Sequence, residues 1–355
     1  MPSLLPSILD ARPLPTCATD TIGHSREGRP IQAFLFGQGP LRVSLIAGCH
    51  ADEPVGPLLL RRLAAFLASL SPENLFLKAM EWWLIPHLNP DGEERNRGWW
   101  RGAEDACDLI GYLTQAVREP PGNDIEFGFP RNLDDLEARP ENQAAWSWWR
   151  TARGPFHLHA SLHGMAFAGG PWFLIDPAWT DRTRELRRRC AEAAQRLGYP
   201  LHDVERRGEK GFHRVERGFA TRPSSQAMAQ HFLSLGDEMT ARLFRPSSME
   251  AIRSLGGDPL TLVSEMPLFI TPGVGEEIGP PDLKALEWKR KIDVWRLQLS
   301  RGQKPERIQA CSDSGCLAPM PVRNQMALQW EFVCAGLEAV KSASPDTLAV
   351  DSTSL

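Results

Sequence analysis

Three His-x-x-Glu tetrads are the first candidates for chemistry in this chain, because imidazole nitrogens and carboxylate oxygens bind divalent metals. They are His50 with Glu53, His202 with Glu205, and His213 with Glu216. The last two lie in the charged stretch 200–223, where a solvated polar face is the simplest interpretation. The first follows the apolar, β-rich run 41–49, which predicts a strand. Ligands bind outside the carboxyl ends of strands in an open α/β sheet, so we favour His50 and Glu53 as metal ligands.

A catalytic zinc site uses three protein ligands and keeps a fourth position for water, so a third ligand is needed. His163 is the best candidate, because it ends the strand predicted over 156–163. Side chains alternate along a strand, which puts His157, His159 and Ser161 on the same face as His163. A polar face of hydrogen-bonded histidines is therefore the alternative for this strand.

Glu265 interrupts the apolar strand predicted over 260–269. A buried carboxylate is costly unless it is paired, bound to a metal or directed into a cavity. In a metallohydrolase this group is the general base for zinc-bound water, whose pKa the metal lowers to about 7. An ion pair with one of the many arginines is the structural alternative.

The elements that must position these residues alternate between strand and helix patterns. Apolar runs of strand length occur at 41–49, 82–88, 156–163, 172–175 and 260–269, and helical patterns occur at 54–70, 180–198 and 224–236. Strands buried on both faces and alternating with helices predict an α/β domain. We expect a single domain over 1–345, with its core at 20–275, covering helices at 282–340 and a flexible tail at 346–355.

The composition excludes several classes of partner. The 40 Lys and Arg residues stand against 44 Asp and Glu residues, for a formal net charge of −4, so nucleic acid and anionic membranes are disfavoured. No apolar run approaches the roughly 20 residues that cross a bilayer, and no signal peptide is visible. Seven cysteines without a Cys-x-x-Cys pair argue against a disulfide framework. We predict a soluble, cytoplasmic protein with a small partner.

Taken together and in this order, the motifs resemble the M14 family of zinc metallocarboxypeptidases. Two further segments support the resemblance: an Asn-Pro-Asp-Gly turn at 89–92, and residues 22–31, which are similar to the family's first hairpin. The resemblance covers about residues 20–275. It implies a three-layer α/β/α fold around a mixed, mostly parallel, twisted sheet of about eight strands.

The resemblance also implies a function and its residues. One zinc ion is expected to be held by His50, Glu53 and His163, while Glu265 passes a proton from the zinc-bound water to the leaving amine. An arginine of the basic loop is expected to polarise the substrate carbonyl and stabilise the oxyanion. The residues favour Arg97 or Arg101 and leave the choice between them open.

The chain departs from the family in a segment that recognises substrate. Members that trim free C-termini carry Asp-x-Asn-Arg-Asn, whose Asn and Arg bind the terminal carboxylate. This chain has Glu126 and Phe127 at those places, and a phenyl ring cannot replace a bidentate guanidinium. Arg131 and Asn132 substitute only after a shift of a few residues. We expect an amide substrate recognised without a free α-carboxylate, with Glu126 attracting a cationic group.

Three functions remain open for the chain. The leading interpretation is a zinc carboxypeptidase or peptide amidase acting on a peptide or small amide. A competing enzyme is an N-acyl amino acid deacylase resembling aspartoacylase and succinylglutamate desuccinylase, although the segments 22–31 and 89–92 favour the peptidase. A non-catalytic binding protein that kept the fold is the third interpretation, and candidates for all the ligands and the base argue against it.

Overall fold

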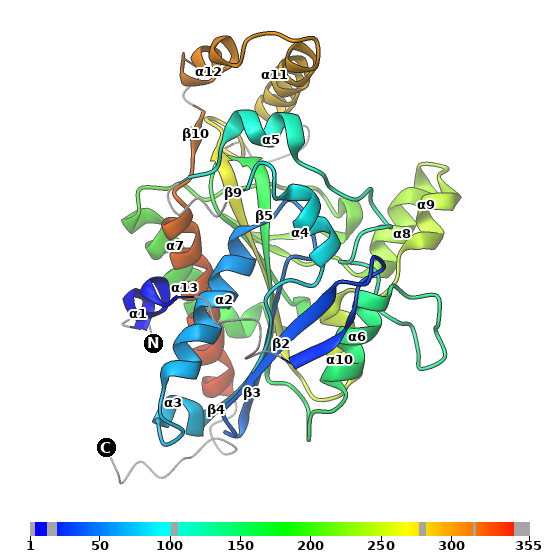
Figure 1. The fold of residues 1–355 in the computed structure, drawn as a ribbon, viewed down its shortest axis with the longest axis vertical. Helices are drawn as coiled ribbons and strands as arrows, with labels where there is room; N and C mark the ends of the chain where they lie inside the picture. The colour runs from blue at the N-terminus through cyan, green and yellow to red at the C-terminus, as the bar shows by residue number, and fades with distance from the viewer. Residues whose placement is uncertain (1–3, 13–19, 101–105, 277–281, 315–316, 344–355) are drawn as a thin grey trace.

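The computed structural model describes residues 4–12, 20–100, 106–276, 282–314 and 317–343. A mixed sheet of ten strands lies between layers of helices (Figure 1). The strand order is β1-β2-β4-β3-β5-β9-β6-β8-β7, and β10 pairs with β9. The expected α/β/α class is confirmed, although the sheet has ten strands in the described residues instead of about eight.

The centre of the sheet consists of four parallel strands with both faces buried. In spatial order they are β4 (Met80–Ile85), β3 (Leu41–Ala47), β5 (Leu158–Ala168) and β9 (Leu260–Ile270). These are the strands that the sequence predicts as continuous apolar runs, as expected for parallel strands covered on both sides.

Antiparallel pairings flank this centre. On one side, β4 pairs with β2 (Pro30–Phe36), and β2 pairs with β1 (Asp20–His24). On the other side, β9 pairs with β6 (Trp172–Ile175) and with β10 (Ala318–Pro319). Beyond β6, the edge strands are β8 (Phe219–Thr221), which is parallel to β6, and β7 (Arg214–Glu216), which is antiparallel to β8.

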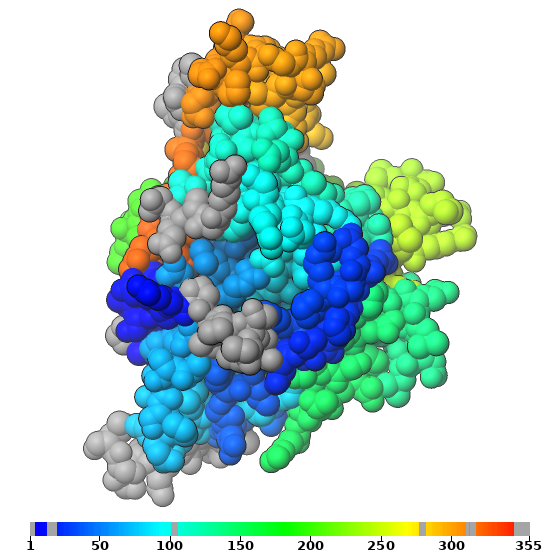
Figure 2. Space-filling model, viewed as in Figure 1, coloured from blue at the N-terminus to red at the C-terminus, as the bar shows by residue number. Residues whose placement is uncertain are grey.

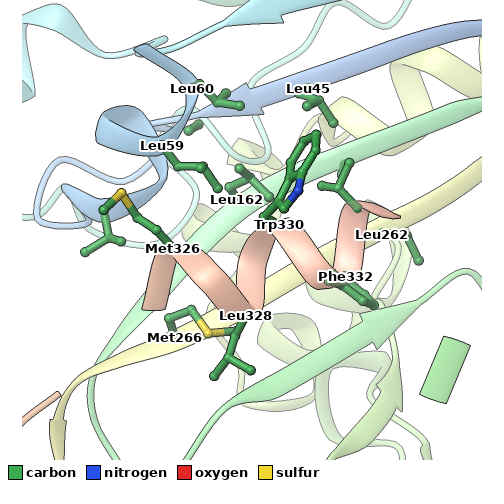
Figure 3. Close-up of a cluster of buried hydrophobic side chains, with 14 of the residues drawn as sticks. Leu45, Leu59, Leu60, Leu162, Leu262, Met266, Met326, Leu328, Trp330 and Phe332 are labelled. Carbon is green, nitrogen blue, oxygen red and sulfur yellow. The ribbon is translucent and has the colours of Figure 1, made fainter. Parts of the chain in front are cut away.

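One face of the sheet is covered mainly by long helices. They are α2 (Val55–Ser69), α7 (Arg184–Arg196) and α13 (Val322–Ala343), with the short α1 (Leu5–Asp10) and α3 (Leu75–Ala79) beside them. Figure 3 shows Trp330 and Phe332 of α13 among leucines of the strands, including Leu162 and Leu262. This burial of large apolar side chains is the main source of the domain's stability.

The opposite face carries α6 (Pro140–Trp149) and α10 (Ser248–Ser254), which pack on a second apolar cluster. The remaining helices are α4 (Pro90–Asn96), α5 (Leu109–Gln115), α8 (Ser225–Ser234), α9 (Glu238–Leu243), α11 (Leu283–Ser300) and α12 (Pro305–Ser314). Helices α11 and α12 project from one end of the molecule, next to α5 (Figure 2). None of the helices in the described ranges has the length and apolar character needed to cross a membrane.

Two boundaries differ from the sequence prediction. Strand β5 continues to Ala168, so His163 lies inside the strand instead of at its end. The reason is that β5 stays paired with β9 as far as Ala168 and Ile270. The region predicted as covering helices over 282–340 is interrupted, because α11 ends at Ser300 and α12 begins at Pro305.

Candidate metal centre

The first two candidate ligands follow β3 through a tight turn at Gly48. Gly48 has a φ of 67°, and a Cβ atom at this position would lie 2.4 Å from the His87 ring. A side chain is excluded both by the backbone conformation and by this close approach. The turn carries His50 and Glu53 past the carboxyl end of β3, before α2 begins at Val55.

Three side chains from two parts of the chain converge here. The Nδ1 atom of His50 is 2.8 Å from Glu53 Oε1, and the Nδ1 atom of His163 is 2.9 Å from Glu53 Oε2. The two Nδ1 atoms are 3.1 Å apart. Two imidazoles and a carboxylate are a ligand set typical of catalytic zinc, and their donor atoms face a common point. The three residues therefore fit a single divalent cation.

Glu265 approaches this cluster from the neighbouring strand. The parallel register of β5 and β9 aligns Glu265 with His163, so both side chains project from the same face of the sheet. Burial, followed by the nearby charge of Glu53, raises the pKa of Glu265 to about 7. A carboxyl group with this pKa exchanges a proton readily near neutral pH.

Arg118 is the arginine that the structure brings to the cluster. Its Nη1 atom lies 3.0 Å from Glu53 Oε1 and 3.3 Å from Asp52 Oδ1. Burial opposes ionisation of Glu53, but His50, Arg118 and His163 outweigh it and hold the pKa of this carboxyl well below its usual range. Glu53 is therefore an anion at neutral pH, as a metal ligand must be.

The arginines favoured by the sequence lie elsewhere. Arg97 is on the surface at the end of α4, where its side chain is 73% exposed and pairs with Glu94. In the described part of the chain it has no contact with the cluster, so its predicted role in catalysis is not supported. Arg101 lies outside the described residues. Sequence reasoning missed Arg118 because it stands in a Pro- and Gly-rich stretch without a surrounding motif.

The Asn-Pro-Asp-Gly turn explains how Arg118 is held. Asn89 caps α4 by accepting a hydrogen bond from Gly92 N, and its Nδ2 donates to Glu119 Oε1 at 2.7 Å. The same turn is tied to the first hairpin, because Asp91 accepts a hydrogen bond from Ser25 Oγ at 2.6 Å. The motif therefore positions the segment that carries Arg118 and contributes no reacting group itself.

Each imidazole has a carboxylate on the side away from the cluster. Asp124 Oδ2 is 3.9 Å from His50 Nε2, and Glu126 Oε2 is 3.0 Å from His163 Nε2. Ser161 Oγ lies 2.7 Å from the same His163 nitrogen. Such outer contacts orient metal-binding histidines and raise their basicity. Glu126 is only 7% exposed and faces an imidazole, so its predicted contact with a cationic substrate group is not supported. Sequence reasoning missed Asp124 altogether.

The other predicted substrate-binding residues stabilise the loop that contains them. The Phe127 ring packs against Phe244, with 5.5 Å between ring centroids. Arg131 Nη2 donates to the carbonyl oxygen of Phe244 at 3.1 Å, and Asn132 Oδ1 accepts from Asp134 N. Within the described residues, none of these polar groups reaches the metal cluster.

The remaining histidines have other partners. His157 Nδ1 accepts a hydrogen bond from Arg42 N, and His159 lies between the hydroxyls of Ser44 and Ser248. His202 was expected on a solvated face but is buried, because Gly275 and Trp172 pack against its ring. Among the histidines of the predicted strand face, the structure brings only His163 to His50 and Glu53 within the described ranges.

A pocket of about 380 Å³ opens beside Arg118. Asp52 and Tyr112 line it on the side of the metal centre, where the Tyr112 hydroxyl donates to Asp52 Oδ2 at 2.9 Å. Helix α11 supplies the opposite wall with Trp288 and Arg296. The pocket provides space for part of a ligand next to the Arg118 guanidinium.

Part of the chain is similar in sequence to known zinc carboxypeptidases. Residues 12–172, slightly less than half of the chain, match the M14 zinc carboxypeptidase family model. The matched range includes His50, Glu53 and His163 but ends before Glu265. Carboxypeptidase D of Anas platyrhynchos is 35% identical over 136 residues, covering 36% of this chain and 10% of that protein. Carboxypeptidase E of Caenorhabditis elegans is 29% identical over 172 residues, covering 40% of this chain and 35% of that protein.

The chain thus matches about a third or less of the length of these curated relatives. Among solved structures, carboxypeptidase A from Helicoverpa armigera aligns with a TM-score of 0.48 and 12% identity, over 92% of this chain and 69% of that one.

Proposed function

Because this chain belongs to the M14 zinc carboxypeptidase family, we propose that it hydrolyses a peptide or peptide-like amide bond with zinc bound by His50, Glu53 and His163. The observation that carries this proposal is the convergence of the three donor groups at one point, with Glu265 aligned beside them. Metal ligands without a nearby proton acceptor would fit a structural metal site equally well. A ligand set with a carboxyl of raised pKa beside it is suited to hydrolysis.

When bound, zinc supplies Lewis-acid polarisation of the carbonyl and of a water molecule. Glu265 takes a proton from the attacking water and delivers it to the leaving nitrogen, and its pKa of about 7 suits both transfers. Arg118 donates N–H groups to the carbonyl oxygen as negative charge develops there. Asp124 and Glu126 act as positioning residues, because they contact the imidazoles and not the reacting atoms.

Recognition of a free terminal carboxylate by residues 126–132 is not part of this proposal. Phe127 is packed against Phe244, and Arg131 is bound to backbone carbonyl oxygens. This supports the expectation that the segment does not bind a terminal carboxylate. Any recognition of substrate charge has to come from another part of the chain.

The direct test is hydrolysis of a panel of N-blocked dipeptides and N-acyl amino acids by the purified protein. We expect activity that disappears with a chelator and returns with zinc. Replacement Glu265→Gln should lower kcat by about 10²–10⁴-fold, the usual contribution of general acid–base catalysis. Bound zinc, measured by elemental analysis, should remain, because Glu265 is not one of the proposed ligands.

A matched control is Glu94→Gln, which removes an exposed carboxylate paired with Arg97 and should leave kcat unchanged. Hydrolysis confined to N-acyl amino acids would instead identify a deacylase. Stoichiometric zinc binding without any hydrolysis would identify a binding protein. Equal kcat values for the wild type and Glu265→Gln would contradict the assigned base.

A further inference from the structure

A row of side chains crosses the sheet from the metal centre to Trp172. The register of β5 and β9 aligns His163 with Glu265, and the register of β9 and β6 aligns Glu265 with Trp172. Aligned residues of neighbouring strands project from the same face. Trp172 therefore stands beyond Glu265 when the face is followed outward from the metal ligands.

Trp172 belongs to a buried apolar cluster, which we call the Trp172 floor. It is a cluster separate from the two main cores, made of Trp172, Leu174, Ala220, Met249 and Val263, with Met165, Val204 and Phe212 packed on it. Met165 shares a face with His163, and Val263 shares a face with Glu265, because side chains alternate along a strand. The floor thus lies beside the reacting groups.

The loop 205–212 faces this floor with an unusual backbone. Arg207 and Lys210 have φ values of 49° and 57°, although both carry a Cβ, and Gly208 and Gly211 between and after them are also left-handed. Such conformations are costly for residues other than glycine and persist where the surrounding structure imposes them, often at binding sites. The consequence here is a tight turn directly after Arg206.

This turn positions the Arg206 side chain beside two aromatic rings. Its guanidinium carbon lies 4.7 Å from the centroid of the Phe212 ring and 5.5 Å from that of Trp172. In the described part of the chain, no carboxylate oxygen forms an ion pair with it within the usual 4.0 Å limit. The aromatic contacts limit the motion of the guanidinium but do not neutralise its charge.

The electrostatic surroundings agree with this geometry. Burial lowers the pKa of Arg206, and the acidic groups Glu209 and Glu265 offset that effect only in part. Burial, followed by the repulsion of Arg206, also lowers the pKa of Lys210. The loop therefore holds two cations that are partly removed from water and lack full compensation, which is a favourable setting for an anion.

We propose that Arg206 binds a carboxylate group of the substrate over the Trp172 floor, on the far side of Glu265 from the metal ligands. A planar guanidinium that lies beside two packed aromatic rings presents paired N–H groups that match a carboxylate. The proposal rests on the proposed hydrolytic function and narrows it to amides with a carboxylate close to the scissile bond. That carboxylate belongs either to a free C-terminus or to an acidic side chain.

Three matched N-blocked dipeptides test the proposal. The first has a neutral last residue with an amidated terminus, the second has the same residue with a free α-carboxylate, and the third has an amidated glutamate. For Arg206→Gln, kcat/KM should fall about 10- to 100-fold on a carboxylate-bearing substrate and stay unchanged on the neutral one. The substrate that responds identifies the source of the carboxylate.

Two further variants separate binding from structure. Arg206→Lys keeps the charge and should restore part of the lost kcat/KM. Arg217→Gln removes an exposed charge from the nearby turn between β7 and β8 and should leave the rates on all three substrates unchanged. An equal loss for Arg206→Gln on neutral and anionic substrates, or no loss on any, would overturn the proposal.

A binding measurement distinguishes failure of this proposal from failure of the proposed function. The zinc-loaded protein is titrated calorimetrically with 3-phenylpropanoate and with its amide, neither of which contains a peptide bond. Weaker binding of the acid by at least tenfold in Arg206→Gln, with no change for the amide, supports the anion site even if no peptide is cleaved. Equal affinities of the wild type and the variant for the acid would reject the site even in an active hydrolase.

Discussion

The metal centre and the Arg206 loop lie on the same face of the sheet but balance their charges in opposite ways. At the candidate metal centre, Glu53 contacts His50, His163 and Arg118, so its negative charge faces groups of positive or convertible charge. In the loop, Arg206 lies beside two aromatic rings and forms no ion pair within 4.0 Å among the residues that the structure describes. A balanced network holds side chains in one geometry, whereas an uncompensated cation remains available for a ligand.

The two regions also differ in how the backbone reaches its turns. The metal centre uses a glycine at its critical left-handed position, Gly48, and a side chain there would collide with His87. The loop places Arg207 and Lys210 in left-handed conformations instead. The turn at Gly48 is therefore unstrained, whereas the turn at Arg207 and Lys210 keeps backbone strain that we connect with ligand recognition.

Replacing Arg118 is expected to change kcat more than the other substitutions that distinguish the two regions. Replacement Arg118→Ala removes the donor proposed to stabilise the carbonyl oxygen, so kcat should fall by about 10²–10³-fold on every substrate. Steady-state kinetics with the three matched dipeptides checks this result. The loss should not depend on substrate charge, in contrast to Arg206→Gln.

Arg97→Ala is the matched control for Arg118→Ala, because it removes an arginine that the structure places on the surface. Its kcat should equal that of the wild type. If Arg97→Ala lost activity and Arg118→Ala kept it, the assignment of the oxyanion-stabilising arginine would have to be reversed.

A smaller effect is expected at Glu126, whose carboxylate faces His163 Nε2. Replacement Glu126→Gln should weaken zinc binding by about 10- to 100-fold, the usual cost of losing an outer contact to a metal-binding histidine. Competition with a chelator of known affinity measures the change. Activity at saturating zinc should return toward the wild-type level, which a general structural defect would not allow.

The smallest effect concerns acid stability and involves two buried histidines that lie outside the proposed metal ligands. Burial lowers the pKa of His159 to about 3 and that of His202 to about 4. Both values lie below about 6.5, the ordinary pKa of an exposed histidine, so the unfolded chain binds more protons in acid.

Stability should therefore be fully present above about pH 6.5 and decrease toward pH 4, by up to about 1.4 kcal/mol per pH unit for each histidine. Urea unfolding at pH 7, 6 and 5 measures this slope. A free energy of unfolding that stays constant over this range would contradict the neutral, buried state of the two imidazoles.

The sequence singled out the residues that converge at the candidate metal centre more clearly than the residues that contact them. His50, Glu53 and Glu265 stood out because polar groups beside or within apolar strands need a partner. Arg118, Asp124 and Arg206 did not stand out, because they lie in irregular segments where neither periodicity nor spacing indicates direction. Glu126 and Phe127 were expected at the substrate because they take the places of the family's carboxylate-binding Asn and Arg, but they contact His163 and Phe244.

By itself, the sequence determined the α/β class and which side chains offer donor atoms for a metal, since both follow from local alternation of apolar residues and from residue types. Only the tertiary structure decided, among the residues that it describes, which arginine reaches Glu53, which carboxylates face the histidines, and that Arg206 lies beside aromatic rings. The physical reason is that these contacts depend on strand register and on the path of loops through space. A register that aligns His163, Glu265 and Trp172 joins residues far apart in the chain, and no local pattern encodes that alignment.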